Sequence, residues 1–216
     1  MSVSQRLVET HQRLFKEATE HALTKQWCDG TLDDKTIYVY LAQDLQFFQH
    51  GLRMTCKMTS LAPDEHSLVT LAKKIGFFAN DENNYFQKCL SLLAGGLDSK
   101  AAEHYKTSQI PAVQKYIALL DRLVAQDYSY AKLVTVCYCM ELVYIQWPKA
   151  NPVNDDLHWK YQTWIDLHAG EHFETWCQFL QEEVDKCDFD EVSEIFGEVL
   201  QHEYEFFDSC YHEGRS

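Results

Sequence analysis

Apolar side chains recur every three or four residues along most of the 216-residue chain. This spacing is the period of an α-helix, and no stretch shows the strict alternation that indicates a half-buried strand. Glycines, prolines and capping acids divide the pattern into helices expected at about 3–26, 33–60, 64–92, 98–107, 111–125, 128–147, 154–168, 170–186 and 189–212. We expect a bend at Gly76 and a helix end at Pro148. No linker-like segment interrupts the pattern, so the sequence predicts one all-α bundle over residues 1–216.

The last expected helix carries an acid on its apolar face. Val192, Ile195, Val199 and Phe206 advance in steps of three, four and seven, and a step of four from Val199 falls on Glu203. Residues at these offsets share one helix face, so Glu203 is expected to point into the core. A buried carboxylate is costly unless it is paired, hydrogen-bonded or protonated.

Two further acids interrupt apolar faces in the same way. Glu141 and Asp44 each have aromatic or apolar residues three and four positions away on both sides. Three buried carboxylates predict a polar pocket inside a helical core, which makes an enzyme active site the first hypothesis.

Composition excludes several classes of function. The formal net charge of −14, with no basic segment, argues against binding to nucleic acid or to an anionic membrane. No apolar stretch is long enough to cross a bilayer, and the amphipathic start is unlike a signal peptide. The 8 cysteines contain no CxxC pair, so free thiols in a reducing cytoplasm are expected and zinc is unsupported.

Three motifs together resemble one family. Gly30-Thr-Leu is followed by Tyr40-Leu-Ala-Gln-Asp44 and Phe47-Phe48, Trp164-Ile165 leads to His168-Ala-Gly-Glu-His-Phe173, and Glu203-Tyr-Glu-Phe-Phe-Asp208 lies near the end. In this order they are similar to the TenA family, also called thiaminase II or aminopyrimidine aminohydrolase. The resemblance covers nearly the whole chain and implies a heme-oxygenase-like, all-helical bundle.

The resemblance implies roles for residues that bind the substrate. Asp44 matches the acid that hydrogen-bonds the aminopyrimidine ring, a task that suits a carboxylate acceptor. Phe47 is expected to pack against the flat ring, and Tyr116 and Tyr144 to complete its walls. His168 occupies the position of a pocket tyrosine, and this departure leaves the substrate substituent open.

The resemblance also implies the catalytic groups. Glu203 matches the general acid/base, and burial is expected to raise its pKa toward neutrality. In cysteine-dependent members a nucleophilic cysteine follows a proline, but Val136-Cys-Tyr-Cys139-Met-Glu141 contains no proline. This segment is more similar to the subgroup with a glutamate in place of that cysteine, so Glu141 is preferred over Cys139, which stays a candidate nucleophile.

Other readings of these residues are weaker. His168-x-x-Glu-His172 fits a zinc-protease spacing, but Gly170 between the histidines indicates a helix break. Paired Glu-x-x-His motifs for a di-iron site are missing, and no axial histidine for heme can be matched, so no metal or cofactor is expected.

The resemblance therefore implies a C–N hydrolase of thiamin salvage. Its substrate would be an aminomethyl- or N-formylaminomethyl-aminopyrimidine, and its products the hydroxymethylpyrimidine and ammonia. A cofactor-free oxidase similar to pyrroloquinoline-quinone synthase is disfavoured, because it needs Arg and His in the pocket. A catalytically silent protein that binds a pyrimidine or a partner is the alternative. By resemblance, the chain is expected to form a homodimer or homotetramer.

Overall fold

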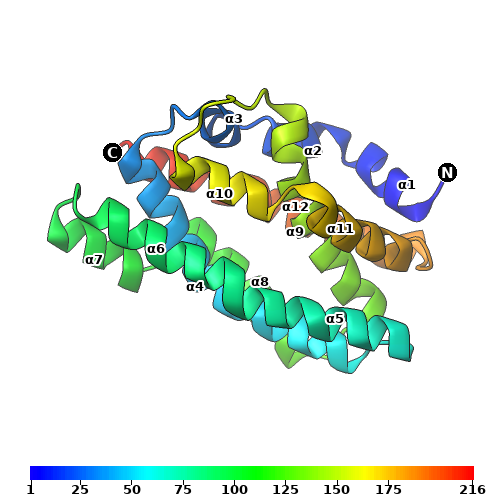
Figure 1. The fold of residues 1–216 in the computed structure, drawn as a ribbon. Helices are drawn as coiled ribbons and strands as arrows, with labels where there is room; N and C mark the ends of the chain where they lie inside the picture. The colour runs from blue at the N-terminus through cyan, green and yellow to red at the C-terminus, as the bar shows by residue number, and fades with distance from the viewer. The chain divides into compact units, whose positions relative to one another are not determined.

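Every regular element in the described part of the chain is a helix (Figure 1). The computed structural model describes residues 1–216, apart from the side chain of residue 81. The elements are α1 (Val3–Thr10), α2 (Gln12–Thr19), α3 (Ala22–Asp29), α4 (Asp34–Ser60), α5 (Glu65–Phe77), the π-helix η1 (Phe78–Glu82), α6 (Asn83–Ala94), α7 (Ser99–Thr107), α8 (Pro111–Ala125), α9 (Tyr130–Ala150), α10 (Trp159–Leu167), α11 (Gly170–Val184) and α12 (Phe189–Gly214).

The helices group into two compact units, each made from separate stretches of the chain. The first unit contains Met1–Thr31 and Ser129–Phe207, and the second contains Leu32–Tyr128 and Asp208–Ser216. In the first unit, α9 packs against α2, α3 and α11, while α1 contacts α2 and α11, and α3 contacts α10. In the second unit, α4 packs against α5, α6, α7 and α8. One domain over residues 1–216 stays a prediction.

The N-terminal helix expected at 3–26 is wrong, because the segment forms three short helices. His11 is at once the C-cap of α1 and the N-cap of α2, and His21 caps α3 by accepting from the backbone N–H of Leu23 at 3.1 Å. His11 packs against the first-unit part of α12, where a Cβ on Gly197 would lie 2.5 Å from its Cε1 atom. Neither histidine is a helix breaker by propensity, so packing imposes these breaks.

The long helix expected at 64–92 does not bend at Gly76. It is interrupted instead by η1, where one wider turn joins α5 to α6. A π turn places an extra residue in the helix and so rotates the side chains that follow it. Phe78 in this turn contacts Phe48 of α4, with ring centroids 6.0 Å apart.

Pro148 does not end α9, which continues to Ala150. A proline lacks the backbone N–H of a helical hydrogen bond and clashes with the preceding turn. Pro148 lies in the last turn of α9, so few helical hydrogen bonds are lost there. Asn151 follows directly, and its side-chain amide donates to the carbonyls of Trp147 at 3.0 Å and Thr19 at 2.9 Å. These bonds fix the end of α9 against the C-terminal end of α2.

The helix expected at 154–168 begins only at Trp159, because His158 caps it by accepting from the backbone N–H of Lys160 at 3.3 Å. The expected boundaries of α4, α7 and α8 agree closely with the structure.

Candidate functional site

The three acids that interrupt apolar helix faces are all buried, as the sequence predicted. The exposed fraction is 5% for Asp44, 8% for Glu141 and 2% for Glu203. Asp44 lies on α4 in the second unit, whereas Glu141 on α9 and Glu203 on α12 lie in the first. The sequence-predicted residues thus form one group in each unit, and their convergence on one substrate stays a prediction.

Glu203 and Cys139 are neighbours in the first unit. Burial, and then the Glu203 carboxylate, raise the pKa of the Cys139 thiol well above its usual value. The thiol donates to the backbone carbonyl of Phe196, with 3.6 Å between Sγ and O. At neutral pH this sulfur is therefore protonated and directed at a backbone acceptor, which makes it a weak nucleophile.

The backbone of α9 at Glu141 lies beside α11. The backbone carbonyl of Glu141 accepts a long, weak contact from the Cys177 thiol of α11, at 3.9 Å. Tyr144 follows it by three residues, so the two side chains share a helix face. The first unit therefore places a buried carboxylate beside an aromatic group on one surface of α9.

Tyr144 and His168 belong to a cluster of aromatic rings in the first unit. The Tyr144 ring stacks on His168 with centroids 4.9 Å apart and on Trp147 with centroids 5.2 Å apart. The rings of Trp164 and Phe207 meet its edge. Tyr144 is half-buried, so its contacts with other rings already occupy much of its aromatic surface.

Phe47 and Tyr116 form an aromatic pair in the second unit, and their role as walls of the substrate site stays a prediction. Their centroids are 4.5 Å apart and their planes are inclined by 45°. Tyr116 on α8 is buried, whereas Phe47 on α4 is half-buried and keeps part of its ring accessible. A half-exposed phenyl ring supported from behind can pack against a flat heterocycle.

Asp44 has two second-unit neighbours that the sequence analysis missed. Burial, and then Asp44, raise the pKa of the Cys210 thiol; burial, then Cys89 and after it Asp44, raise the pKa of the Tyr85 phenol. Tyr85 lies on α6 and Cys210 on α12, and both are buried. The sequence offers only a weak indication of these two residues. Cys210 lies two helical turns after Glu203, and Tyr85 lies one turn before Cys89.

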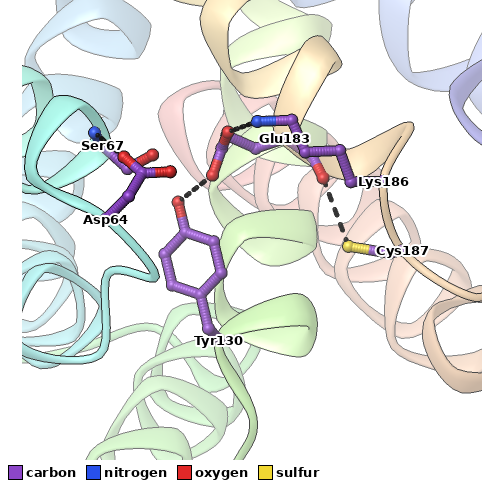
Figure 2. Close-up of polar contacts among 6 residues, drawn as sticks. All are labelled: Asp64, Ser67, Tyr130, Glu183, Lys186 and Cys187. Atoms are coloured by element: carbon purple, nitrogen blue, oxygen red, sulfur yellow. Dashed lines mark hydrogen bonds and ion pairs between the residues drawn. The ribbon is translucent and has the colours of Figure 1, made fainter.

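A fourth buried carboxylate, Glu183 on α11, was also missed, and its partners indicate a structural role. Tyr130 of α9 donates its hydroxyl to Oε2 at 2.7 Å, and the Lys186 ammonium contacts Oε1 (Figure 2). The Cys187 thiol donates to the Glu183 backbone carbonyl at 3.4 Å. This carboxylate links the start of α9 to the end of α11.

The zinc-protease spacing does not form one helical face. His168 is the C-cap of α10, and His172 lies on α11, which begins at Gly170 with a φ of 79°. Among the described residues, no group of three or more His, Cys, Asp and Glu side chains is arranged to hold a metal ion. Within the same residues, no helix combines the length and the apolar character needed to cross a membrane.

Solved structures share this fold over almost the whole chain. A TenA homologue from Pyrococcus furiosus is similar with a TM-score of 0.82 and 19% identity, covering 96% of this chain and 99% of that one. A TenA-family transcription regulator from Silicibacter sp. TM1040 has a TM-score of 0.78 and 15% identity, with 97% and 96% covered. A TenA-like protein from Sulfolobus solfataricus P2, provisionally named a thiaminase, has a TM-score of 0.76 and 16% identity, again with 97% and 96% covered.

No curated protein matches the chain in sequence. A family model nevertheless does, from residue 8 to residue 213. The all-α, heme-oxygenase-like fold expected from the motifs is confirmed. The chain therefore belongs to the TENA/THI-4/PQQC family.

Proposed function

We propose that this chain is a C–N hydrolase of thiamin salvage that acts on an aminomethyl- or N-formylaminomethyl-aminopyrimidine. With the aminomethyl substrate, water supplies the hydroxyl of the hydroxymethylpyrimidine and the nitrogen leaves as ammonia. The family supports this reaction class. The solved structure provisionally named a thiaminase is consistent with it.

The observation that carries the proposal is the buried pair formed by Glu203 and Cys139. The carboxylate lies close enough to the thiol to raise its pKa, and the thiol is hydrogen-bonded to a backbone carbonyl. A protonated, buried sulfur favours catalysis by carboxylates, with Glu203 as the general acid/base. Glu203 would take a proton from the attacking water and deliver a proton to the leaving nitrogen.

Glu141 is proposed as the second catalytic carboxylate. It is buried on α9, two residues after Cys139, and we propose that it activates water or forms an ester with the substrate. In the competing assignment Cys139 is the nucleophile, and Glu203 would first remove its proton. The raised pKa of the thiol favours the carboxylate route over this assignment.

The substrate ring is proposed to be held by Asp44 and by the aromatic pair of Phe47 and Tyr116. A carboxylate can accept from the exocyclic amine, and the half-exposed Phe47 ring can pack against the heterocycle. Tyr144 and His168 are proposed to border the reacting substituent. The free thiols agree with a proposed cytoplasmic location, and a homodimer or homotetramer is proposed from the family resemblance.

A silent binding protein or regulator is the second candidate, because one structural neighbour is named as a transcription regulator. A net charge of −14 disfavours contact with the DNA backbone. A regulator built on this chain would therefore act through a small ligand or a protein partner.

The test is release of ammonia from the aminomethyl substrate by the parent protein and by single variants. Glu203→Gln is expected to abolish turnover, Glu141→Gln to reduce it severely, and Cys139→Ser to retain it. Glu205→Gln is the matched control, because Glu205 lies on α12 two residues away and accepts from Gln201 at 2.9 Å.

Loss of turnover in Cys139→Ser with an intact fold would assign the nucleophile to the thiol. If the parent protein turns over neither the amine, nor its formylated form, nor thiamin, the proposed hydrolase activity is refuted. The silent binding protein is then the remaining candidate.

A further inference from the structure

Gln43 is a fully buried residue of α4 whose side-chain amide binds three backbone groups between the end of α7 and the start of α8. Its Nε2 atom donates to the carbonyls of Tyr105 at 2.7 Å and Ser108 at 2.8 Å. Its Oε1 atom accepts from the backbone N–H of Ile110 at 2.9 Å. Both amide hydrogens and the amide oxygen are therefore used to hold one segment of the chain against α4.

These bonds determine where α8 begins. Ile110 is the N-cap of α8, and the helix has no side-chain cap of its own. Gln43 therefore holds the N-cap residue from outside the helix. A second glutamine of α4, Gln46, adds a donation to the Tyr105 carbonyl at 3.0 Å. Because hydrogen bonds are short and directional, the start of α8 cannot slide along α4 without breaking them.

Further polar contacts continue along the same face of α4. Gln43, His50 and Lys57 follow one another at intervals of seven residues, or about two helical turns. The Nδ1 atom of His50 lies 2.6 Å from Oδ1 of Asp121, and Lys57 donates to the carbonyl of Val124 at 2.9 Å. α8 is therefore held to α4 at its start and again towards its end.

The aromatic pair of the proposed substrate site lies between the first two of these contacts. Phe47 follows Gln43 by one turn of α4, and Tyr116 follows Ile110 on α8. The two rings are in contact, with centroids 4.5 Å apart. A displacement of α8 by one residue would move the Tyr116 ring by about 1.5 Å relative to Phe47. The contact between the rings thus depends on where α8 starts.

We propose that Gln43 is a positioning residue for the substrate ring, because it fixes the start of α8 and so holds Tyr116 against Phe47. The inference rests on the proposed function, in which this aromatic pair and Asp44 bind the aminopyrimidine. The proposed catalytic carboxylates belong to the first unit, whereas Gln43 belongs to the second. Gln43 therefore acts on binding of the ring and leaves the bond-breaking step unchanged.

The test is Gln43→Met, which keeps the length of the side chain but removes all three bonds. The readouts are kcat and KM for the aminomethyl substrate and the Kd of the hydroxymethylpyrimidine product. We expect KM and Kd to rise about 3- to 10-fold, the effect of losing one aromatic packing contact, while kcat changes by less than about twofold.

Tyr38→Phe is the matched control. Tyr38 is also a buried residue of α4, and its hydroxyl donates to the carbonyl of Ala102 in α7 at 3.1 Å. This variant removes a buried hydrogen bond of α4 without touching the start of α8, so KM is expected to stay at the parent value. If Gln43→Met does not fold, Gln46→Met decides the question. It removes only one bond to the same segment and is expected to give a smaller rise in KM with kcat unchanged.

A double-mutant cycle tests whether Gln43 acts through Tyr116. In a Tyr116→Leu background the ring that Gln43 positions is gone, so adding Gln43→Met, or Gln46→Met in its place, should raise KM by less than about twofold. An equal rise in KM in both backgrounds would overturn the positioning role. A fall in kcat with unchanged KM, or the same rise in Tyr38→Phe, would overturn it as well.

A measurement without substrate tests the geometry on which the role depends. Nuclear Overhauser effects between the Phe47 and Tyr116 rings are expected in the parent protein and in Tyr38→Phe, and should weaken in the glutamine variant. Unchanged effects in a folded variant would refute the inference. A parent protein that neither binds nor turns over an aminopyrimidine refutes the proposed function and this role together. An active parent with unchanged KM in the folded glutamine variant refutes this role alone.

Discussion

Replacing Glu183 by glutamine is expected to destabilise the first unit without creating a cavity. The two side chains have nearly the same volume, so the change acts on charge and hydrogen bonding alone. The Glu183 side chain is 2% exposed and accepts from the Tyr130 hydroxyl at 2.7 Å (Figure 2). A hydrogen bond to a buried charged group contributes about 1.5–3 kcal/mol.

The contact with Lys186 adds little, because 65% of the Lys186 side chain is exposed. Such exposed pairs contribute about 0.2–1 kcal/mol after solvent screening. The glutamine oxygen can still accept from the Tyr130 hydroxyl, so only the difference between a charged and a neutral hydrogen bond is lost, and we expect Glu183→Gln to lower the free energy of unfolding by about 1–2 kcal/mol. For a chain of this length that corresponds to a fall in Tm of about 2–8 °C.

The assay is urea and thermal unfolding followed by circular dichroism, with Glu182→Gln as the matched control. Glu182 precedes Glu183 on α11 but is exposed, and it accepts from Gln178 one turn earlier on the same helix. The control is expected to stay within about 0.5 kcal/mol of the parent protein. A double-mutant cycle with Tyr130→Phe should give a coupling of about 1–2 kcal/mol. If Glu183→Gln is as harmless as Glu182→Gln, the carboxylate does not stabilise the junction of α9 and α11.

Four further outcomes are expected. Gly214→Ala should destabilise by about 1–3 kcal/mol, because its Cβ would lie 2.5 Å from a backbone atom of α4. Gly76→Ala, at an open site in α5, should stabilise by about 0.5–1 kcal/mol, and urea unfolding compares the two. A thiol reagent should label the exposed Cys56 within the folded protein but reach Cys139 only on unfolding, as mass spectrometry would show. Burial, and then Asp29, raise the pKa of Cys28 to about 12. Because the unfolded thiol loses its proton near pH 8.5 and the folded one does not, stability should fall as the pH rises above about 8.5. Urea unfolding at pH 8 and pH 10 measures this, and Cys28→Ala should reduce the slope.

Much of the fold could be predicted from local patterns. Pro111 at the first position of α8 and the apolar face that follows give that helix its start and its length. The burial of Glu203, Glu141 and Asp44 followed from the fixed rotation of the helix, which places residues three and four apart on one face. These predictions needed no knowledge of what each face packs against.

Other features depended on groups far away in the sequence. Nothing in the residues around Glu183 shows that its carboxylate meets Tyr130, which lies 53 residues earlier. The helix breaks at His11 and His21 also occur without a glycine or proline at either position. His11 packs against Gly197, a contact that no local propensity encodes. Sequence reasoning therefore overestimated the length of the first helix and underestimated the number of buried acids.

The sequence by itself determined that the chain is helical, that Asp44, Glu141 and Glu203 are buried, and which family motifs are present. These depend on helical period and residue identity, which are local properties. Only the tertiary structure decided how a buried group is used. It gave Cys139 a backbone acceptor and a nearby carboxylate, and it placed the imidazole of His168 on the ring of Tyr144. Protonation and orientation depend on distances between residues on different helices, and packing alone sets those distances.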